Sequence, residues 1–386
     1  MTESAARTAT FTESVIREMT RVANQHGAIN LAQGFPDFPM PDAMKDAARA
    51  AIDGDINQYA ITWGNPTLRH AIAEAYGEWY DMPVDPEREV TVTCGATEAM
   101  ASTFLALIDP GDEVIVLEPF YENYGPDAIL ASAMPVFVPL DPPAWRIDPE
   151  RLRRAFTPRT KAIIVNSPHN PTGRVFTREE LGCIAELCVE HDAWAFTDDP
   201  YEKIIYTGTH HPIAMMPGMR ERTVTISSLS KTFSCTGWRL GYAIAPAEAT
   251  NAIRKVHDFL TVGAPAPLQA AAATGFRFGA DYYASLAAGY HARRECLSRA
   301  LREAGFTFTI PEGAYYLFAD FSALSDQSDV DFAKWLAREV GVAPVPGSSF
   351  YHQRELGRRY VRFAFCKRLE TLERAAERLA SLRARV

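Results

Sequence analysis

The segment Thr223-Val-Thr-Ile-Ser-Ser-Leu-Ser-Lys231-Thr-Phe-Ser-Cys-Thr-Gly-Trp-Arg239 joins a β-branched run to a loop of small hydroxyl residues that contains one lysine. Hydroxyl groups donate to phosphate oxygens, and Arg239 can clamp the same phosphate through two N–H groups. A partly desolvated lysine beside other cations has a lowered pKa and becomes an amine nucleophile. The hydroxyl side chains are those of Ser228, Ser230, Thr232 and Ser234. The alternative is a solvent-exposed loop with a structural arginine.

Short apolar runs like this one recur over the central part of the chain. They are continuous and rich in Val and Ile, as expected for strands that are buried on both faces. Stretches with helical spacing, such as 97–108 and 178–191, lie between them. Alternating strands and helices predict an α/β fold: a mostly parallel seven-stranded sheet flanked by helices. The seven runs are 89–93, 113–117, 135–138, 161–165, 193–197, 223–227 and 239–245.

The C-terminal part has a different pattern. It predicts helices over 284–304 and 370–385 and strands over 307–309, 315–319 and 359–365. We expect a smaller α+β domain, against which the turn-rich first 45 residues pack. The predicted division is therefore a large domain over 46–283 and a small domain over 1–45 plus 284–386.

Composition argues against several classes of protein. The 386 residues carry a net charge of −9, so binding to nucleic acid is not expected. The six cysteines contain no CxxC pair, so we expect no metal site and free thiols in a reducing compartment. The N-terminus lacks a signal-peptide core, and no apolar run approaches the length of a membrane span. These features predict a cytoplasmic protein with no membrane contact.

Three more polar motifs directly follow predicted strands. Ligands of open α/β sheets bind beyond the carboxyl ends of the strands, so these residues are candidates for a site. Gly95-Ala96-Thr97 opens a helix whose backbone N–H groups can bind an anion, although many such turns carry Gly for geometry alone. Two prolines fix the backbone around Asn170, which could equally be a rigid turn. The motifs are Thr93-Cys-Gly-Ala-Thr97, Asn166-Ser-Pro-His-Asn-Pro-Thr-Gly173 and Asp198-Asp-Pro-Tyr201.

The carboxylate of Asp198 closes a strand and would point into the crevice, where a cationic ring nitrogen could keep it ionised. Asp199 would face elsewhere. We call the helix start at Gly95-Ala96-Thr97 the anion cup. Along the chain it is followed by Asn170, then by Asp198 with Tyr201, and then by Lys231 with Arg239. In this order the motifs resemble those of a class I/II aminotransferase of PLP fold type I, over nearly the whole length of the chain. The sequences of segments 29–38, 57–59 and 346–351 are similar to those of the kynurenine, glutamine and methionine aminotransferase branch.

The resemblance implies a role for each matching residue. Lys231 would carry pyridoxal 5'-phosphate as a Schiff base and shuttle the α-proton. Asp198 would keep the pyridinium nitrogen protonated, which makes the ring an electron sink. Asn170 and Tyr201 would bond the ring O3′, and Tyr121 would stack on the ring unless it is a core tyrosine. The phosphate would be held by Gly95, Ala96, Thr97, Ser228, Ser230 and Arg239.

The resemblance also implies residues for the substrate and for a second subunit. Arg362 would clamp the α-carboxylate, a task that suits a planar guanidinium better than an ammonium. Gly34 would cover the substrate, Asn170 would also contact it, and Phe35 would line the side-chain pocket. Tyr59 would reach the phosphate of a neighbouring subunit, which implies a homodimer with shared active sites. His169 is interpreted as a satisfied loop histidine rather than a ligand.

The expected reaction is a ping-pong transfer from an L-amino acid to a 2-oxo acid. Segment 260–267, where a partner chain would approach the substrate, contains no arginine. A dedicated site for a second carboxylate would supply one, so neutral aromatic or thioether donors are favoured. The alternatives are a β-lyase, an amino-acid oxidase, an aspartate-type aminotransferase, or the effector domain of a transcription regulator. The last would need a DNA-binding domain before residue 30.

Overall fold

The computed structural model describes residues 5–9 and 13–382 and contains the predicted seven-stranded sheet. The strand order is β2-β8-β7-β6-β5-β3-β4, and all neighbours are parallel except that β8 runs antiparallel to both β2 and β7. All seven predicted runs are confirmed as strands. The strands are β2 (Val90–Thr93), β3 (Glu113–Glu118), β4 (Met134–Pro139), β5 (Thr160–Val165), β6 (Trp194–Asp198), β7 (Thr223–Ser228) and β8 (Gly241–Ile244).

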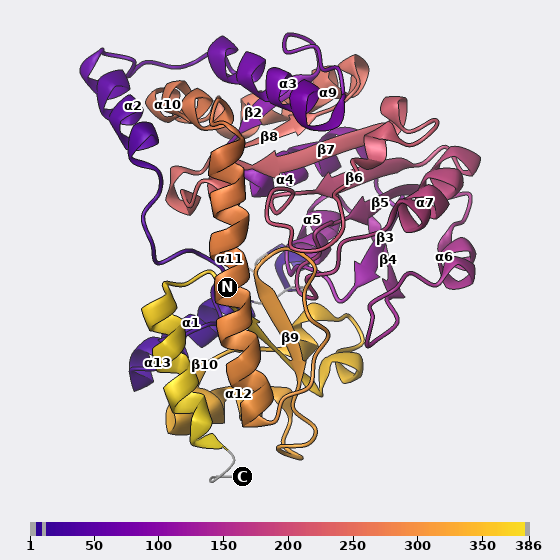
Figure 1. The fold of residues 1–386 in the computed structure, drawn as a ribbon. Coiled ribbons are helices and arrows are strands. Elements are labelled where there is room, and N and C mark those ends of the chain that lie inside the picture. The colour runs from indigo at the N-terminus through magenta and orange to yellow at the C-terminus, as the bar shows by residue number, and fades with distance from the viewer. Residues whose placement is uncertain (1–4, 10–12, 383–386) are drawn as a thin grey trace.

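Helices cover both faces of this sheet, as Figure 1 shows. In β3, Val114 and Val116 pack in one apolar cluster with α4, α5 and α9, whereas Ile115 and Leu117 pack in another with α7. This alternation of two apolar faces explains why the strands read as continuous apolar runs. The helices of this part are α2 (Asp42–Asp53), α3 (Pro66–Tyr80), α4 (Ala96–Leu107), α5 (Tyr124–Leu130), α6 (Pro149–Ala155), α7 (Arg178–Glu190), α8 (Leu229–Thr232), α9 (Ala247–Thr261) and α10 (Ala266–Phe276).

A second, smaller group of elements lies below the large sheet in Figure 1. Strands β11, β12 and β9 form an antiparallel sheet, and β1 pairs in parallel with β10, which joins the first residues of the chain to the C-terminal part. The strands are β1 (Ile29–Asn30), β9 (Tyr316–Asp320), β10 (Val342–Ala343), β11 (Val345–Pro346) and β12 (Tyr360–Ala364). The helices are α1 (Val15–His26), α11 (Ala280–Ala304), α12 (Asp329–Trp335) and α13 (Leu369–Ala380).

One predicted strand is wrong. Segment 307–309 forms only an isolated bridge between Thr307 and Asp320. Beyond this pair the segment does not follow β9, and the Thr309 hydroxyl instead donates to the carbonyl oxygen of Pro143. The last predicted helix ends at Ala380, and part of its predicted range, from 383 onward, lies outside the described residues. So do parts of the expected small domain, at 1–4 and 10–12.

The division into two domains stays a prediction. Its boundaries at 45/46 and 283/284 fall inside α2 and α11, both of which continue across them. In Figure 1, α11 runs from the level of α10 down to the small group of elements, so one helix connects the two parts. Among the described residues, no helix is long and apolar enough to cross a membrane.

Short helical turns complete the chain. They are η1 (Ala6–Ala9), η2 (Ile213–Met215), η3 (Arg220–Arg222), η4 (Thr236–Trp238), the π-helical η5 (Leu336–Val340), η6 (Gly347–Phe350) and η7 (Arg354–Gly357).

Candidate active site

A cavity of about 840 Å³ lies beyond the carboxyl ends of the central strands. This is where ligands bind in open α/β sheets. Most of the residues singled out from the sequence line it. They are Gly34, Phe35, Ala96, Thr97, Tyr121, Asn170, Asp198, Tyr201, Ser228, Ser230, Lys231, Arg239 and Arg362.

Lys231 lies in α8, the single helical turn that follows β7. Its Nζ donates to the carbonyl oxygen of Gly34 at 3.4 Å. Burial lowers the pKa of Lys231, and the positive charges of Arg239 and Arg362 act in the same direction. The charge of Asp198 opposes this shift. The arrangement therefore favours a neutral amine, the form that acts as a nucleophile or a base.

Asp198 ends β6, and its carboxylate is held by a residue that the sequence argument did not single out. The hydroxyl of Tyr124 donates to Oδ2 of Asp198 at 2.7 Å. Burial raises the pKa of Asp198, whereas the bond from Tyr124 and the charge of Lys231 lower it. A cation bound in the cavity against Asp198 would stabilise its ionised form further. Asp199, its neighbour, is buried and does not line the cavity, as expected.

The anion cup lies at the start of α4. Gly95 has φ of +86°, and a Cβ built there would come within 2.4 Å of Nη2 of Arg239. Arg239 is itself left-handed, with φ of +52°, and its Nη1 donates to the carbonyl of Thr236 at 3.0 Å. The guanidinium thus lies directly against the helix N-terminus. Together, the positive charge and the free backbone N–H groups suit a phosphate. Gly95 borders Arg239 but does not itself line the cavity, and neither do Thr232 and Ser234.

Arg362 lies in the middle of β12 and is 1% exposed. Its Nη1 donates to Oδ1 of Asn170 at 2.9 Å and its Nη2 to the carbonyl of Ala32 at 2.8 Å. Its Nε has no hydrogen-bond partner, and none of the described carboxylates forms an ion pair with it. The guanidinium carbon lies 4.2 Å from the ring centre of Tyr316. A buried arginine without a counter-charge is costly, so the site favours an anionic ligand.

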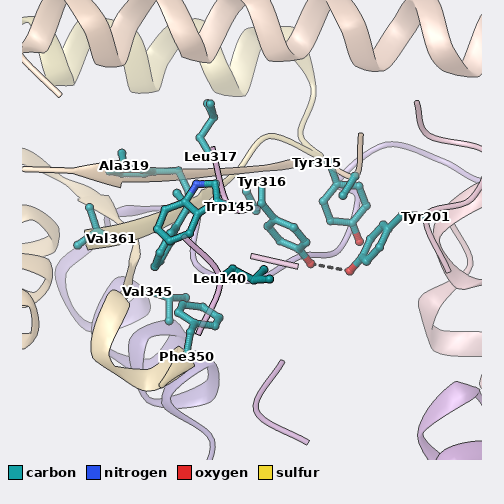
Figure 2. Close-up of a cluster of buried hydrophobic side chains, with 14 of the residues drawn as sticks. Leu140, Trp145, Tyr201, Tyr315, Tyr316, Leu317, Ala319, Val345, Phe350 and Val361 are labelled. Atoms are coloured by element: carbon teal, nitrogen blue, oxygen red, sulfur yellow. Dashed lines mark hydrogen bonds between the residues drawn. The ribbon is translucent and has the colours of Figure 1, made fainter. Parts of the chain in front are cut away.

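Tyr315 and Tyr316, where β9 begins, lie beside Tyr201, as Figure 2 shows, and Tyr316 lines the cavity. The hydroxyl groups of Tyr201 and Tyr316 lie 2.9 Å apart. Tyr315 donates to the carbonyl of Gly34 at 2.8 Å. The sequence argument placed this segment on a strand but assigned it no role. Strand alternation puts neighbouring side chains on opposite faces, which could have marked one of the pair for the cavity.

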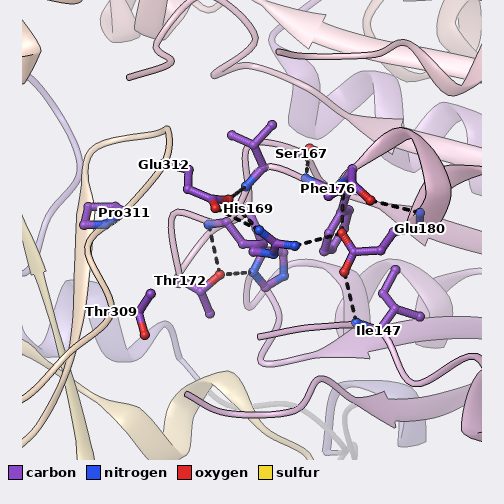
Figure 3. Close-up of polar contacts among 12 residues, drawn as sticks. Ile147, Ser167, His169, Thr172, Phe176, Glu180, Thr309, Pro311 and Glu312 are labelled. Atoms are coloured by element: carbon purple, nitrogen blue, oxygen red, sulfur yellow. Dashed lines mark hydrogen bonds and ion pairs between the residues drawn. The ribbon is translucent and has the colours of Figure 1, made fainter. Parts of the chain in front are cut away.

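The loop that contains Asn170 is held in place by Glu312, a residue of the C-terminal part of the chain, as Figure 3 shows. Arg174, from this loop, pairs with Glu180 at 3.0 Å and with Glu312 at 2.8 Å. The backbone amides of Glu312 and Gly313 both donate to the carbonyl of Gly173. Asn166 Oδ1 accepts from the amide of Asn170 at 2.7 Å, which aims the Asn170 side chain. The two prolines are thus only part of what orients Asn170.

Tyr59, which was predicted to reach a neighbouring subunit, and His169, which was interpreted as a loop histidine and not a ligand, lie outside the cavity. Tyr59 is 87% exposed and does not line the cavity of its own chain. His169 is buried beside Thr172, with Nδ1 and Oγ1 2.8 Å apart, and does not line the cavity either. Burial lowers the pKa of His169 to about 3, so its ring is neutral.

Comparison with known proteins adds relatives over the full length. A family model described as aminotransferase class I and II matches residues 26–379. The chain is 42% identical to a probable N-succinyldiaminopimelate aminotransferase of Mycobacterium tuberculosis over 383 residues, 96% of either chain. It is 38% identical to human kynurenine–oxoglutarate transaminase 1 over 397 residues, 94% of either chain.

Solved structures agree with these relatives. The structure of the M. tuberculosis aminotransferase matches with a TM-score of 0.96 and 42% identity, covering 98% of this chain and 100% of the other. A protein of Escherichia coli, YbdL, whose structure identified a methionine aminotransferase function, matches with a TM-score of 0.95 and 35% identity over 99% and 100%. The fold expected from the sequence motifs, PLP fold type I, is thereby confirmed.

Proposed function

Because the chain belongs to the class I and II aminotransferases, which depend on pyridoxal phosphate, we propose that it moves the amino group of a neutral, aromatic or thioether L-amino acid to a 2-oxo acid in a ping-pong cycle. The observation that carries the proposal is that Lys231, Asp198 and Arg362 line one cavity. The three groups would supply the amine that carries the cofactor, a carboxylate for its ring nitrogen and a guanidinium for the α-carboxylate of the donor.

The residues present fit the cofactor. The backbone at Gly95 leaves no room for a Cβ beside Arg239, which keeps a cradle open for a phosphate. Asp198 offers one carboxylate oxygen that Tyr124 does not occupy. Pyridoxal phosphate supplies an electron sink for the carbanion of the amino acid. The phosphate would be held by Gly95, Ala96, Thr97, Ser228, Ser230 and Arg239, the ring by Tyr121 and Asp198, and O3′ by Asn170 and Tyr201.

Lys231 would both carry the cofactor and act as the base. Burial lowers the pKa of Lys231, which favours the neutral amine, the form that can accept the proton on Cα of the donor. Its hydrogen bond to Gly34 places the amine under the N-terminal segment, which would cover the substrate together with Phe35. Arg362 and Asn170 would orient the α-carboxylate.

The assignment of Lys231 is tested by spectroscopy and by a half-reaction. We expect the wild-type protein loaded with pyridoxal phosphate to release one equivalent of 2-oxo acid from its donor without an acceptor. Lys231→Ala should bind the cofactor non-covalently and lose the half-reaction. Covalent attachment that survives in Lys231→Ala would overturn the assignment.

The donor class rests on the cavity wall. Phe35, Phe120, Tyr121 and Tyr351 line it, which favours aromatic and thioether side chains. The similarity to a kynurenine transaminase and to a methionine aminotransferase supports the same class. A panel of kynurenine, phenylalanine, methionine, aspartate and glutamate, each with 2-oxoglutarate and with pyruvate, ranks donors by kcat/KM. Pyruvate and ammonia produced without an acceptor would indicate a β-lyase, and peroxide an oxidase.

One observation favours a second candidate, a donor that carries a distal carboxylate. Arg17 and Arg354 also line the cavity, and no described acidic side chain forms an ion pair with either. The similarity to an N-succinyldiaminopimelate aminotransferase supports this class. Arg17→Ala and Arg354→Ala would then lower kcat/KM for acidic donors alone. Arg49→Ala, at an exposed position of α2 outside the cavity, is the control.

We also propose the homodimer with shared active sites. The Thr62 hydroxyl donates to Oδ1 of Asp258 at 3.2 Å, and the Thr62 carbonyl oxygen lies 2.8 Å from Nε2 of His257. These contacts bring Tyr59 and segment 260–267 onto one side of the molecule. Tyr59 and Phe259 are 87% and 92% exposed there, an apolar surface typical of an interface. Sedimentation should give the mass of two chains, and Tyr59→Phe should weaken cofactor binding. A fully active monomer would contradict the proposal.

The cytoplasmic location stays part of this proposal. All six cysteines are free, which suits a reducing compartment. Cell fractionation with activity assays of each fraction tests it.

A further inference from the structure

Asp127 is a buried carboxyl group in the cavity wall that none of the roles above uses. It lies in α5, is 5% exposed, and lines the cavity together with Asp198 and Tyr124. Its Oδ2 has no hydrogen-bond partner among the described residues. Buried polar groups are almost always paired, and an unpaired carboxylate would be especially costly. The group therefore requires either a proton or a ligand.

The position of Asp127 connects it to Asp198. Tyr124 and Asp127 are three residues apart in α5, so their side chains share one face of the helix. The Tyr124 hydroxyl donates to Oδ2 of Asp198 at 2.7 Å. Asp198 thus has a donor and Asp127 has none. Two carboxyl groups in one buried cavity wall do not both ionise readily. Asp198, which accepts a hydrogen bond, therefore keeps the negative charge.

Helix α4 and strand β4, the two elements that pack most extensively on α5, bring no cation to Asp127. The only titratable side chain of α4 is Glu98, which bonds His257, Ser102 and the amide of Cys94. Strand β4, which also packs on α5, has no titratable side chain. Burial, and then the charge of Asp198, raise the pKa of Asp127 to about 8. At neutral pH this leaves Asp127 as a carboxylic acid.

We propose that Asp127 is a positioning residue of the cofactor site: with Asp198 it forms a carboxyl pair that carries a single negative charge, held on Asp198 where the ring nitrogen would bind. The proposal rests on the proposed function for the identity of the cofactor. Asp127 acts through Asp198. When Asp127 loses its proton at alkaline pH, a second negative charge lies near the ring, and this charge favours the protonated cofactor.

The test uses the full-length protein loaded with pyridoxal phosphate, titrated between pH 5 and 10. We expect the alkaline midpoint of the cofactor absorbance to fall by about one pH unit in both Asp127→Asn and Asp127→Val, because either variant removes the second negative charge. Glu122→Gln is the matched control. Glu122 lines the same cavity but accepts a hydrogen bond from Ser14. The alkaline midpoint of Glu122→Gln should therefore shift by less than half as much as that of the Asp127 variants.

A second readout reports on Asp127 itself. The infrared carbonyl absorption of protonated carboxylic acids at pH 7 should be weaker in Asp127→Asn than in the wild type. An unchanged midpoint in both variants, or no loss of that absorption, would overturn the proposal. Failure of the proposed function would look different, because no cofactor absorbance would then appear in any of the proteins.

Discussion

Replacing Asp127 by Asn changes how the stability of the protein depends on pH. The pKa of Asp127 is raised from 3.8 to about 8 in the folded chain, mainly by burial and secondly by Asp198. An acid whose folded pKa is raised stabilises the fold fully below its unfolded pKa. It loses that contribution as pH rises toward the folded pKa. The relevant window is therefore pH 3.8 to about 8.

The magnitude follows from the width of this window. Each pKa unit corresponds to about 1.4 kcal/mol, so at pH 7 the ionisation of Asp127 in the unfolded chain costs the wild type about 4 kcal/mol. Asn cannot ionise, so Asp127→Asn does not lose this amount. A buried amide without a partner costs about 1–3 kcal/mol at every pH. The free energy of unfolding of the variant, minus that of the wild type, should thus rise by about 1.4 kcal/mol per pH unit.

Urea denaturation at pH 5, 6 and 7 measures this difference in the protein without added cofactor. Asp326→Asn, at an exposed position, is the control and should give a difference that does not change with pH. A flat difference for Asp127→Asn would refute the reasoning, because it would mean that Asp127 ionises equally easily in both states. A constant offset alone would reflect only the packing of the amide.

Further predictions concern the substrate arginine, the tyrosine beside Asp198, and the sheet under the anion cup. Arg362→Lys should raise the KM of the amino donor by about 30- to 160-fold in steady-state assays, since a bidentate charge-assisted contact is worth about 2–3 kcal/mol. An unchanged KM would place the carboxylate elsewhere. Tyr124→Phe should raise the Kd of pyridoxal phosphate by about tenfold in equilibrium dialysis, because a neutral-to-charged hydrogen bond of about 1.5 kcal/mol is lost; an unchanged Kd would mean that this bond is not needed. Gly241→Ala should lower the free energy of unfolding by at least about 2 kcal/mol, since its Cβ would come 2.4 Å from the backbone nitrogen of Ala96. Gly182→Ala, in α7 with nothing within 4 Å, should raise it by about 0.5–1 kcal/mol, and equal effects of the two would contradict the packing argument.

The strands were predictable because their signal is local. In the run 113–117 the residues after Glu113 are apolar on both faces, and the structure buries every residue of β3. The order of the strands is not local. Nothing in the run 239–245 reveals that β8 is inserted between β2 and β7 and runs antiparallel to both. Segment 307–309 reads as a strand by composition, but its pairing depends on Asp320 and stops after one bridge.

The site divides in the same way. Residues at or just after the end of a strand, such as Asp198 and Lys231, were predictable because the carboxyl ends of parallel strands meet at one edge. Tyr124 and Asp127 reach the cavity from a helix that covers the sheet, and Tyr316 from the other part of the chain. Their approach depends on how distant segments pack, which spacing along the sequence does not reveal.

Gly34 illustrates what such packing does to the site as a whole. Its carbonyl oxygen accepts from both Lys231 and Tyr315, and the space where its Cβ would lie is filled by the Tyr316 hydroxyl. Two residues earlier, the carbonyl of Ala32 accepts from Arg362. A short length of main chain is thus a common reference point for the amine, the aromatic wall and the guanidinium. A small displacement of this segment would change all three together, so it couples the opening of the cavity to the geometry of the groups inside it.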